Sequence, residues 1–252
     1  MTDGLKGLIV GVANEHSIAW GCAKALREAG AELALTYLND KAKPHVEPLA
    51  RSVNAVLFLP LEVTDEAQLA ALFETVRARW GRLDFIIHSI AFAPKDDLQG
   101  RVADSSRAGF MTAMDVSCHS LIRLAKAAEP LMTEGGAILT MSYLGAEKVV
   151  ANYNLMGPVK AALESSVRYL AAELGPKGIR VNALSPGPVM TRAASGLSHF
   201  DELLRKAAAE SPLRRAATIE EIGEVAAFLV SARARLITGQ TIYADGGFSI
   251  TR

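Results

Sequence analysis

Short apolar runs alternate with amphipathic, helix-forming segments along the whole chain. The apolar runs predict seven strands, at 7–13, 32–37, 55–59, 83–88, 136–141, 179–184 and 240–244. Between them, apolar positions at helical spacing predict helices at 18–29, 64–80, 106–128, 159–174 and 218–230. Continuous apolar strands that alternate with helices are typical of a parallel sheet covered on both faces.

Neither a break in composition nor an internal repeat divides this pattern. We therefore expect residues 1–252 to form a single-domain α/β fold, a Rossmann-like doubly wound parallel sheet of about seven strands with helices on both faces. Residues 41–53 are expected to be irregular because Pro44 and Pro48 interrupt a weak helical pattern. Residues 95–101 are expected to form a loop, and the small, polar residues at about 189–210 a mobile segment that covers the substrate.

Residues that begin and end helices mark several of these boundaries. Ser17 is a candidate N-cap, Gly30 is placed to end the first helix, and Thr218 with Glu221 has the spacing of a capping box. These signals support the helix limits given above.

Composition narrows the class of protein. The chain has 27 basic and 27 acidic residues and 50% apolar residues, without a basic run, which argues against nucleic acid as a partner. It has neither a signal peptide nor 18 consecutive apolar residues, so we expect no membrane span. Two isolated cysteines, Cys22 and Cys118, favour a reducing compartment, and together these features predict a cytoplasmic protein. The five histidines lack metal-ligand spacing, so no metal site is expected.

The turn after the first predicted strand has the composition of a phosphate-binding loop. Gly11 permits a tight turn, and Ala13 permits close approach of a ligand to the backbone. Ser17 offers both its hydroxyl and a helix N-terminus to a pyrophosphate. Gly21 is expected to let this helix lie close to the sheet. The alternative is an ordinary strand-to-helix turn in which small residues serve packing.

Two further loops at the same expected edge suit a dinucleotide. Glu62 and Val63 follow the third strand, where a carboxylate can accept a hydrogen bond from an adenine amino group. Ser89, Ile90 and Ala91 follow the fourth, and their small size suits close passage of a ribose. Either stretch taken alone is more often a plain loop.

Residues 143–160 carry the candidate chemistry. Tyr153 and Lys160 are seven residues apart, about two helical turns, so on one helix they share a face. The lysine is then expected to lower the pKa of the tyrosine and improve it as a proton donor. The alternative is two ordinary residues on an amphipathic helix.

The motifs as a set resemble those of the short-chain dehydrogenase/reductase superfamily and, more closely, of its NADH-dependent enoyl-(acyl-carrier-protein) reductases. The matching stretches occur in the expected order: GVANEHSIAWG (11–21), HSIAFAP (88–94), SYLGAE (142–147), NYNLMGPVK (152–160), RVNALSPGP (180–188), RRAATIEEIG (214–223) and DGGFSI (245–250). Thr140 occupies the position of the superfamily's catalytic serine, and Tyr143 precedes Tyr153 by ten residues as in the enoyl reductases. That substitution favours reduction of a C=C bond over reduction of a ketone.

The resemblance implies that NADH delivers hydride to the β-carbon of a trans-2-enoyl thioester in fatty-acid synthesis. It gives catalytic roles to Tyr153, which hydrogen-bonds the developing enolate, to Lys160, which holds the nicotinamide ribose, and to Tyr143, which orients the substrate. The implied cofactor (NADH/NAD) residues are Gly11, Ala13, Ser17, Ile18, Leu38, Glu62, Val63, Ser89, Ile90, Ala91, Lys160, Pro188, Val189 and Thr191. The implied substrate residues are Ala93, Tyr143, Tyr153 and Met156.

The implied partner is acyl-carrier protein bearing the enoyl thioester. The implied assembly is a homotetramer, with Phe248 and the helix after Tyr153 between subunits. Leu197 and Phe200, with Phe92 and Met190, are candidates to line an acyl pocket, with core packing as the alternative.

The chain departs from the family pattern at Glu62, where aspartate is usual, and at Ala91, Leu38 and His119. Ser198, Asp201 and Glu202 stand where basic residues would suit an acidic carrier. NADH is expected over NADPH, because in 36–41 the only cation is Lys41, which Asp40 offsets. The alternative functions are a short-chain ketone or alcohol oxidoreductase and a non-catalytic nucleotide-binding relative.

Overall fold

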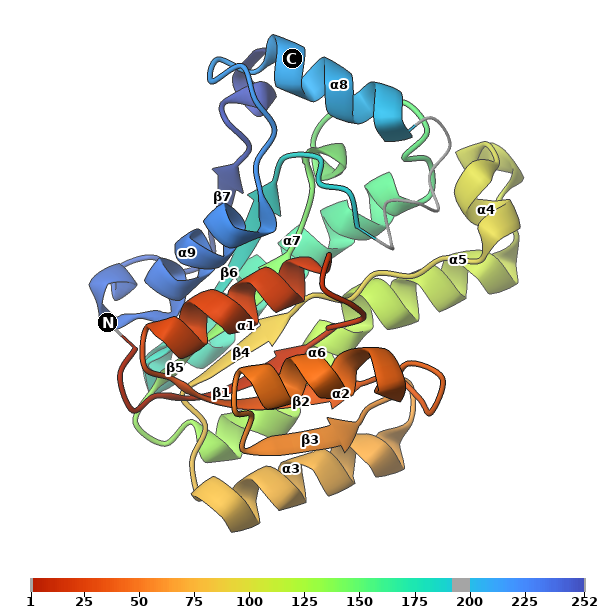
Figure 1. Ribbon diagram of the computed structural model, residues 1–252. Helices are drawn as coiled ribbons and strands as arrows, with labels where there is room; N and C mark the ends of the chain where they lie inside the picture. The colour runs from red at the N-terminus through yellow and green to blue at the C-terminus, as the bar shows by residue number, and fades with distance from the viewer. Residues whose placement is uncertain (1, 192–199, 252) are drawn as a thin grey trace.

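The structure is a computed structural model that describes residues 2–191 and 200–251. Its seven strands form one parallel sheet in the order β3-β2-β1-β4-β5-β6-β7 (Figure 1). They are β1 (Lys6–Val10), β2 (Glu32–Tyr37), β3 (Leu57–Pro60), β4 (Phe85–His88), β5 (Gly136–Met141), β6 (Ile179–Pro186) and β7 (Thr241–Ala244). The predicted doubly wound parallel sheet is therefore confirmed.

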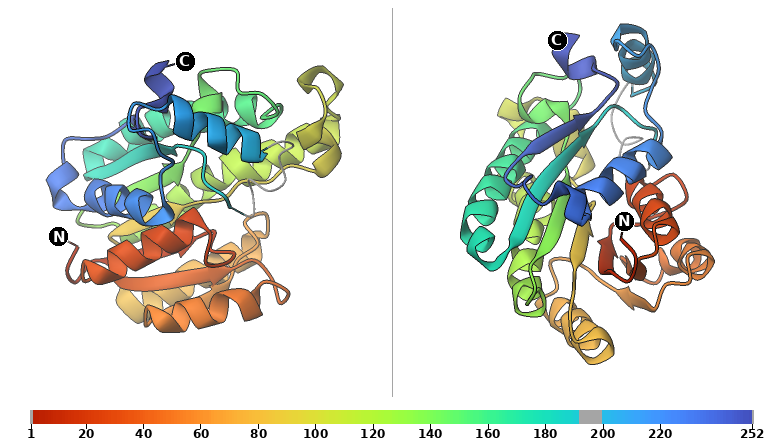
Figure 2. Two further views of the ribbon diagram at one scale, coloured as in Figure 1. Left: turned by 45° about the horizontal axis from the view of Figure 1, so that its top comes forward. Right: turned by 90° about the vertical axis from the view of Figure 1, so that its left-hand side faces the viewer.

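Helices cover both faces of this sheet, as the right-hand view of Figure 2 shows. One face carries α1 (Ile18–Glu28), α2 (Lys43–Ser52) and α9 (Ile219–Val230). The other carries α3 (Glu66–Trp80), α5 (Arg107–Met114), α6 (Ser120–Ala128) and α7 (Met156–Leu174). Two more helices, α4 (Lys95–Gln99) and α8 (Phe200–Glu210), lie away from these layers, with α8 beyond the ends of β6 and β7 in Figure 1.

Strand residues divide between the two cores with the period of two that a pleated strand requires. In β4, Ile86 packs under α3 and α6, whereas Phe85 and Ile87 pack under α1 and α9. All three are fully buried. This two-sided burial explains why the strands are continuous apolar runs in the sequence.

Three local expectations were wrong. Residues 43–52 form the regular helix α2, because Pro44 lies in its first turn, where the missing N–H costs nothing, and Pro48 removes a single bond. Residues 95–99 form the short helix α4 rather than a loop. The helix predicted over 106–128 is divided by a π-helical turn, η2 (Asp115–His119).

The helix-end signals had mixed outcomes. Thr218 and Glu221 form the predicted capping box, and Gly30 follows α1 at φ +95°. Ser17 stands at the N-cap of α1, but its side chain does not cap the helix. Gly21 brings α1 close to α9 rather than to the sheet, since a Cβ there would lie 2.0 Å from the Ile219 carbonyl oxygen.

Candidate active site

The predicted site residues lie at the carboxyl edge of the sheet, around the point where the strand order reverses. β1 and β4 are neighbours in space but not in sequence, and Val10 pairs with His88 at this edge. His88 in turn pairs with Thr140 on β5. In open α/β sheets, ligands bind at this crevice.

Gly11 makes the turn off β1 possible. Its φ is +111°, and a Cβ would lie 2.1 Å from the carbonyl oxygen of Ser89 in the loop after β4. Only glycine fits such an approach between two backbones. The first cofactor loop therefore packs directly against the predicted ribose loop.

Ser17 organises the cofactor loop from within. Its Oγ accepts hydrogen bonds from the backbone N–H groups of Ala13 and Asn14, both at 3.0 Å, and donates to the Asn14 carbonyl oxygen at 2.8 Å. The hydroxyl expected to face a pyrophosphate is thus used to shape the loop. The first-turn N–H groups of α1, beginning at Ile18, are the remaining donors for an anion.

The other predicted cofactor residues follow neighbouring strands. Val63 is buried, and the Glu62 carboxylate accepts from the Thr64 hydroxyl at 3.2 Å. Leu38 is 49% exposed after β2. The remaining predicted cofactor residues follow β4 and β6. Pro188 is buried and Ala91 is exposed, and the partly buried ones are Ser89, Ile90, Val189 and Thr191.

A second cation lies beside the end of β2. Lys43 Nζ is 5.6 Å from the centroid of the Tyr37 ring. The prediction of cofactor preference rested only on residues 36–41, in which Lys41 is the one basic residue. The structure adds Lys43 to the positive charges near the end of β2. The side-chain oxygen of Asn39 is not available to a ligand, because Oδ1 already accepts hydrogen bonds from the backbone N–H groups of Lys41 and Ala42, both at 3.1 Å.

Tyr143 and Tyr153 pack edge to face, with ring centroids 4.8 Å apart and planes at 62°. Tyr143 follows β5, and Tyr153 lies in a turn just before α7. The assumption that Tyr153 and Lys160 share a helix was therefore wrong: α7 begins at Met156. A turn, rather than helical periodicity, sets the position of Tyr153.

That turn depends on two asparagines and a glycine. Asn152 and Asn154 flank Tyr153 with φ of +62° and +44°, a conformation asparagine tolerates better than most residues. Asn154 Nδ2 donates to the Leu98 carbonyl oxygen at 3.0 Å. Gly145 leaves room for the phenol, since a Cβ there would lie 2.2 Å from the Tyr153 ring.

Lys160 lies on α7, seven residues after Tyr153. Its side chain is 4% exposed, and Nζ donates to the Met141 carbonyl oxygen at 2.7 Å. Burial lowers the pKa of Lys160 to about 8, while Cys118 and Glu164 act to raise it. An ammonium has three donors, so this one bond leaves capacity to hold ribose hydroxyls.

The expected lowering of the Tyr153 pKa was wrong. Burial raises the pKa of Tyr153, and the neighbouring Tyr143 and Glu164 raise it further. The ring is 9% exposed, and loss of water disfavours the phenolate form. Tyr153 is therefore a neutral phenol, able to donate a hydrogen bond throughout the physiological pH range.

His88 is a fully buried core residue, and it determines what Thr140 can do. Ser120 Oγ donates to the Val116 carbonyl oxygen at 2.6 Å, so at 2.8 Å it must accept from His88 Nε2. His88 Nδ1 is then an acceptor, and Thr140 Oγ1 donates to it at 2.7 Å. Burial, with Lys160, lowers the pKa of His88 to about 3, consistent with this neutral ring.

The π-helical turn η2 was not foreseen, yet it fixes the loop after β4. Ser117 Oγ accepts from Phe92 N–H at 2.9 Å and donates to the Phe92 carbonyl oxygen at 3.0 Å. Such turns are frequent at functional sites. The run of small polar residues Ser117, Cys118 and Ser120 inside an apolar helix was the available signal.

The candidate substrate residues divide by exposure. Ala93 and Met156 are buried, at 8% and 5% exposed, whereas Phe92 and Met190 are open to solvent at 53% and 43%. The core-packing alternative is therefore wrong for Phe92 and Met190 within this chain. Leu197 and Ser198 lie outside the described residues, as does the side chain of Phe200.

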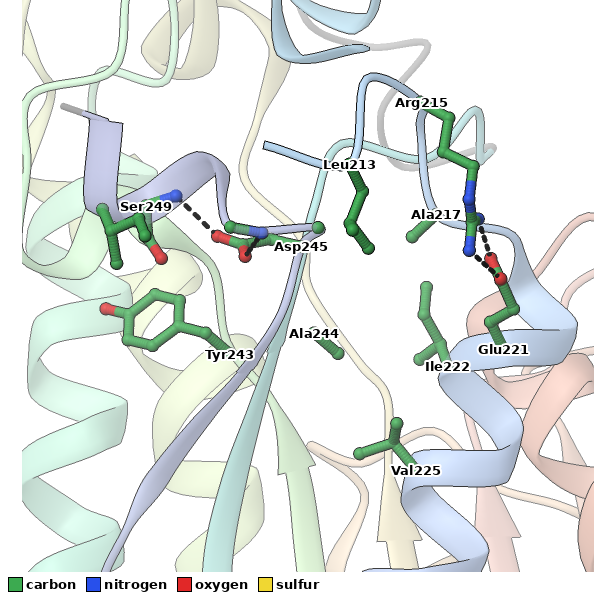
Figure 3. A pocket seen from close by; sticks show the side chains of 13 residues that line it. Leu213, Arg215, Ala217, Glu221, Ile222, Val225, Tyr243, Ala244, Asp245 and Ser249 are labelled. Carbon is green, nitrogen blue, oxygen red and sulfur yellow. Dashed lines mark hydrogen bonds and ion pairs between the residues drawn. The ribbon is translucent and has the colours of Figure 1, made fainter. Parts of the chain in front are cut away.

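Two pockets have linings that include neither Tyr143 nor Tyr153. One of 360 Å³, shown in Figure 3, lies between the start of α9 and the end of β7. There Asp245 accepts from the N–H groups of Gly247 and Ser249, both at 2.8 Å, so the DGG motif shapes a turn. The other, of 330 Å³, is lined by 144, 148–152 and residues of α8. α8 thus lies over the loop that carries Tyr143.

Among residues 2–191 and 200–251, no three His, Cys, Asp or Glu side chains converge as metal ligands. No helix in the described part of the chain is long and apolar enough to cross a membrane.

Comparison with known proteins extends this geometry to a family. Residues 11–249 match the family described as enoyl-(acyl carrier protein) reductase. The chain is 50% identical over 250 residues to enoyl-(acyl-carrier-protein) reductase (NADH) FabI of a Nostoc species, covering 98% of this chain and 97% of the relative. FabI of Bacillus subtilis is 45% identical over 251 residues, covering 99% and 97%.

Solved structures agree. The enoyl-(acyl-carrier-protein) reductase of Anaplasma phagocytophilum, in complex with NAD, superposes with a TM-score of 0.95 at 49% identity, covering 99% of this chain and 95% of that one. The Bacillus cereus enoyl-acyl carrier protein reductase, with NADP+ and indole naphthyridinone, superposes with a TM-score of 0.97 at 47% identity, covering 99% and 98%. The chain belongs to the family of NADH-dependent enoyl-(acyl-carrier-protein) reductases.

Proposed function

We propose that this chain reduces the C=C bond of a trans-2-enoyl thioester on acyl-carrier protein, with Tyr153 as the donor to the thioester oxygen. The observation that carries the proposal is the edge-to-face pair of Tyr143 and Tyr153 at the carboxyl edge of the sheet, with buried Lys160 on the helix that follows Tyr153.

The residues at this edge fit a dinucleotide. The Gly11 turn has no space for a side chain, the loop held by Ser17 leads into the N-terminus of α1, and Lys160 has donors to spare. The full set proposed to hold NADH is the one named above, from Gly11 to Thr191. When bound, NADH supplies the hydride that the β-carbon receives.

Tyr153 stabilises the charge that develops on the substrate. As hydride adds to the β-carbon, negative charge builds on the thioester oxygen, and a positioned donor there lowers the barrier. Because the pKa of Tyr153 is raised, its proton stays in place to donate. Tyr143 packs against this ring and orients the acyl group. Lys160 holds the ribose and adds positive potential.

The ketone-reductase alternative is disfavoured by Thr140. Its hydroxyl proton is committed to His88, and its side chain is fully buried. It cannot serve as the second donor that the corresponding serine provides in ketone reduction. The non-catalytic alternative is disfavoured by the presence of Tyr153 and Lys160 together at the cofactor edge.

We extend the proposal to a cytoplasmic homotetramer. Large apolar side chains are exposed on α5, α7, α9 and the carboxyl-terminal segment: Phe110, Met111, Tyr169, Phe228 and Ile250. Burial between subunits would remove them from water. Phe248, expected between subunits, is already buried inside its own chain against Leu144 and Ala207, so the exposed residues around it are the ones proposed for such an interface. Free Cys22 and Cys118 suit a reducing compartment.

The segment at about 189–210 is proposed to cover the acyl chain. Of it, the structure describes the loop 189–191 and α8. Amide hydrogen exchange in this segment should slow when cofactor and an acyl ligand are both bound, because lids exclude water from the reacting centre. Unchanged exchange would contradict the proposal.

One assay tests the function. NADH oxidation should be fast with a crotonyl thioester and negligible with a β-ketoacyl thioester. Turnover of the ketone but not the enoyl substrate would establish the ketone reductase, and turnover of neither, with NADH still bound, would establish the non-catalytic relative.

A further inference from the structure

Glu164 is a buried carboxyl group that the proposed reaction does not use. It lies on α7 one turn after Lys160 and is 5% exposed. A carboxylate is rarely buried without a partner, because removing it from water is costly. Its surroundings therefore indicate what it does.

Hydroxyl groups from the residue after β5 and from β7 meet this carboxyl. Ser142, itself buried, donates from Oγ to Glu164 Oε1 at 2.5 Å, and Thr241 donates from β7. An O–H donor at this distance is typical of an ionised acceptor. The pKa of Glu164 is raised by burial and by the neighbouring Glu147, while the two hydroxyl donors and Arg168 limit the rise.

The bond to Ser142 completes a clamp at the end of β5. Lys160 bonds the carbonyl oxygen of Met141, and Glu164 bonds the hydroxyl of the next residue, Ser142. The following residue is Tyr143. Two side chains one turn apart on α7 therefore fix the backbone from which Tyr143 projects.

Few groups around Lys160 carry a negative charge at neutral pH that could stabilise its buried ammonium. His88 is neutral there, because its pKa lies near 3. Tyr153 keeps its proton. Cys118, like Glu164, acts to raise the pKa of Lys160. Glu164 itself faces Glu147, Arg168 and, on β7, Tyr243.

We propose that Glu164 is a positioning residue of this active site: its ionised carboxylate fixes Ser142 and keeps the buried Lys160 side chain in its ammonium form. The proposal rests on the proposed function, since it assigns Glu164 to the lysine that holds the cofactor ribose. It acts through Lys160 and not on the substrate.

The test is the pH dependence of Glu164→Gln, which keeps an acceptor for Ser142 and removes the charge. Loss of that charge lowers the pKa of Lys160, so the alkaline limb of kcat/KM should move down by about one pH unit. NADH affinity from fluorescence titration should fall several-fold at pH 8.5 and be unchanged at pH 6. Glu173→Gln, at an exposed position of the same helix, is the matched control.

Two outcomes would overturn the proposal. A wild-type alkaline limb in Glu164→Gln would show that its charge does not act on Lys160. A shift in Cys118→Ala, without one in Glu164→Gln, would assign the charge to the thiol instead. If Glu164→Gln does not fold, the double variant Ser142→Ala/Glu164→Met carries the same test, because it removes both partners of the bond.

The NADH titration separates this proposal from the proposed function. If the wild-type protein reduced no enoyl thioester, the function would fail, yet the pH dependence of NADH binding would still report on Glu164. If enoyl reduction were present and NADH binding by Glu164→Gln matched wild type at every pH, this proposal alone would fail.

Discussion

The loop after β1 and the turn before α7 meet at one edge of the sheet, but they hold their key residues in different ways. Ser17 is bonded to residues three and four positions earlier in its own loop. Tyr153 is positioned by residues distant in the sequence: its ring packs against Gly145, and the neighbouring Asn154 donates a hydrogen bond to the Leu98 carbonyl oxygen. The cofactor loop is thus a local structure, whereas the catalytic turn is built by packing between segments far apart in sequence.

This difference matters for function because the two regions have different tasks. A loop that shapes itself can present backbone donors to any bound dinucleotide. A phenol that must meet one atom of a substrate needs a position fixed from several sides. Changes in the first region should therefore affect cofactor affinity and stability, and changes in the second should affect turnover.

The largest expected effect is that of Tyr153→Phe, which removes the proposed donor while keeping the ring. Loss of one such donor typically lowers kcat by about 10²–10³-fold. NADH affinity should stay near wild type, because Lys160 holds the ribose. Steady-state kinetics and NADH titration measure the two quantities.

Two further variants locate the effect. Tyr143→Phe should have a smaller effect, mainly on KM for the acyl substrate, and Lys160→Ala should weaken NADH binding as well as turnover. Loss of turnover in Tyr143→Phe with an active Tyr153→Phe would reverse the two tyrosines' roles.

Next in size is Gly145→Ala, which tests whether packing alone positions Tyr153. The new Cβ would lie 2.2 Å from the ring, so the phenol must move. A misplacement near 1 Å can cost about 10²-fold, so kcat should fall by about ten- to a hundredfold with NADH affinity retained. Gly175→Ala is the matched control, since nothing lies within 4 Å of its Cβ. Equal kcat in the two variants would show that Tyr153 does not depend on Gly145.

The same contrast explains which features the sequence could predict. Buried parallel strands and the capping box at Thr218 depend on neighbouring residues, and both were found as predicted. The seven-residue spacing suggested that Tyr153 and Lys160 share a helix, but the same spacing also fits a turn followed by a helix. Only the fold shows that Gly145 packs against the Tyr153 ring. The predicted direction of the Tyr153 pKa shift was wrong for a similar reason, because the spacing of two residues does not show how deeply either is buried.

The π-helical turn η2 lies between these cases. Ser117 and Ser120 were visible as polar residues in an apolar helix, but their partners, Phe92 and His88, belong to other elements. Thr140 illustrates the same point. Its position suggested a lost catalytic hydroxyl, and its bond to His88 supplies the reason.

A smaller effect is expected for Ser17→Ala in the local region. It leaves the part-buried N–H groups of Ala13 and Asn14 without their acceptor, and loss of a hydrogen bond typically costs about 0.5–1.5 kcal/mol. The free energy of unfolding should fall by about that amount, and NADH should bind more weakly, with kcat at saturating NADH near wild type. Ser52→Ala, at an exposed helix end, is the control. A lowered kcat with normal NADH affinity would contradict the separation of the two regions.

The smallest expected effect concerns the choice of cofactor at the end of β2. We predict that NADH is preferred over NADPH, since a 2′-phosphate needs arginine or a cluster of lysines near Leu38. The charge of Lys41 is offset by Asp40. Lys43 Nζ, 5.6 Å from the Tyr37 ring centroid, is the remaining cation near the end of β2, and we expect it to support weak use of NADPH by attracting the 2′-phosphate. Lys43→Ala should therefore lower kcat/KM for NADPH by a few-fold and leave NADH unchanged, because one exposed charge contributes at most about 1 kcal/mol. Lys126→Ala, an exposed lysine on α6, is the control for net charge. Comparable kcat/KM for both cofactors in the wild-type enzyme would contradict the preference, and an unchanged ratio in Lys43→Ala would remove Lys43 from it.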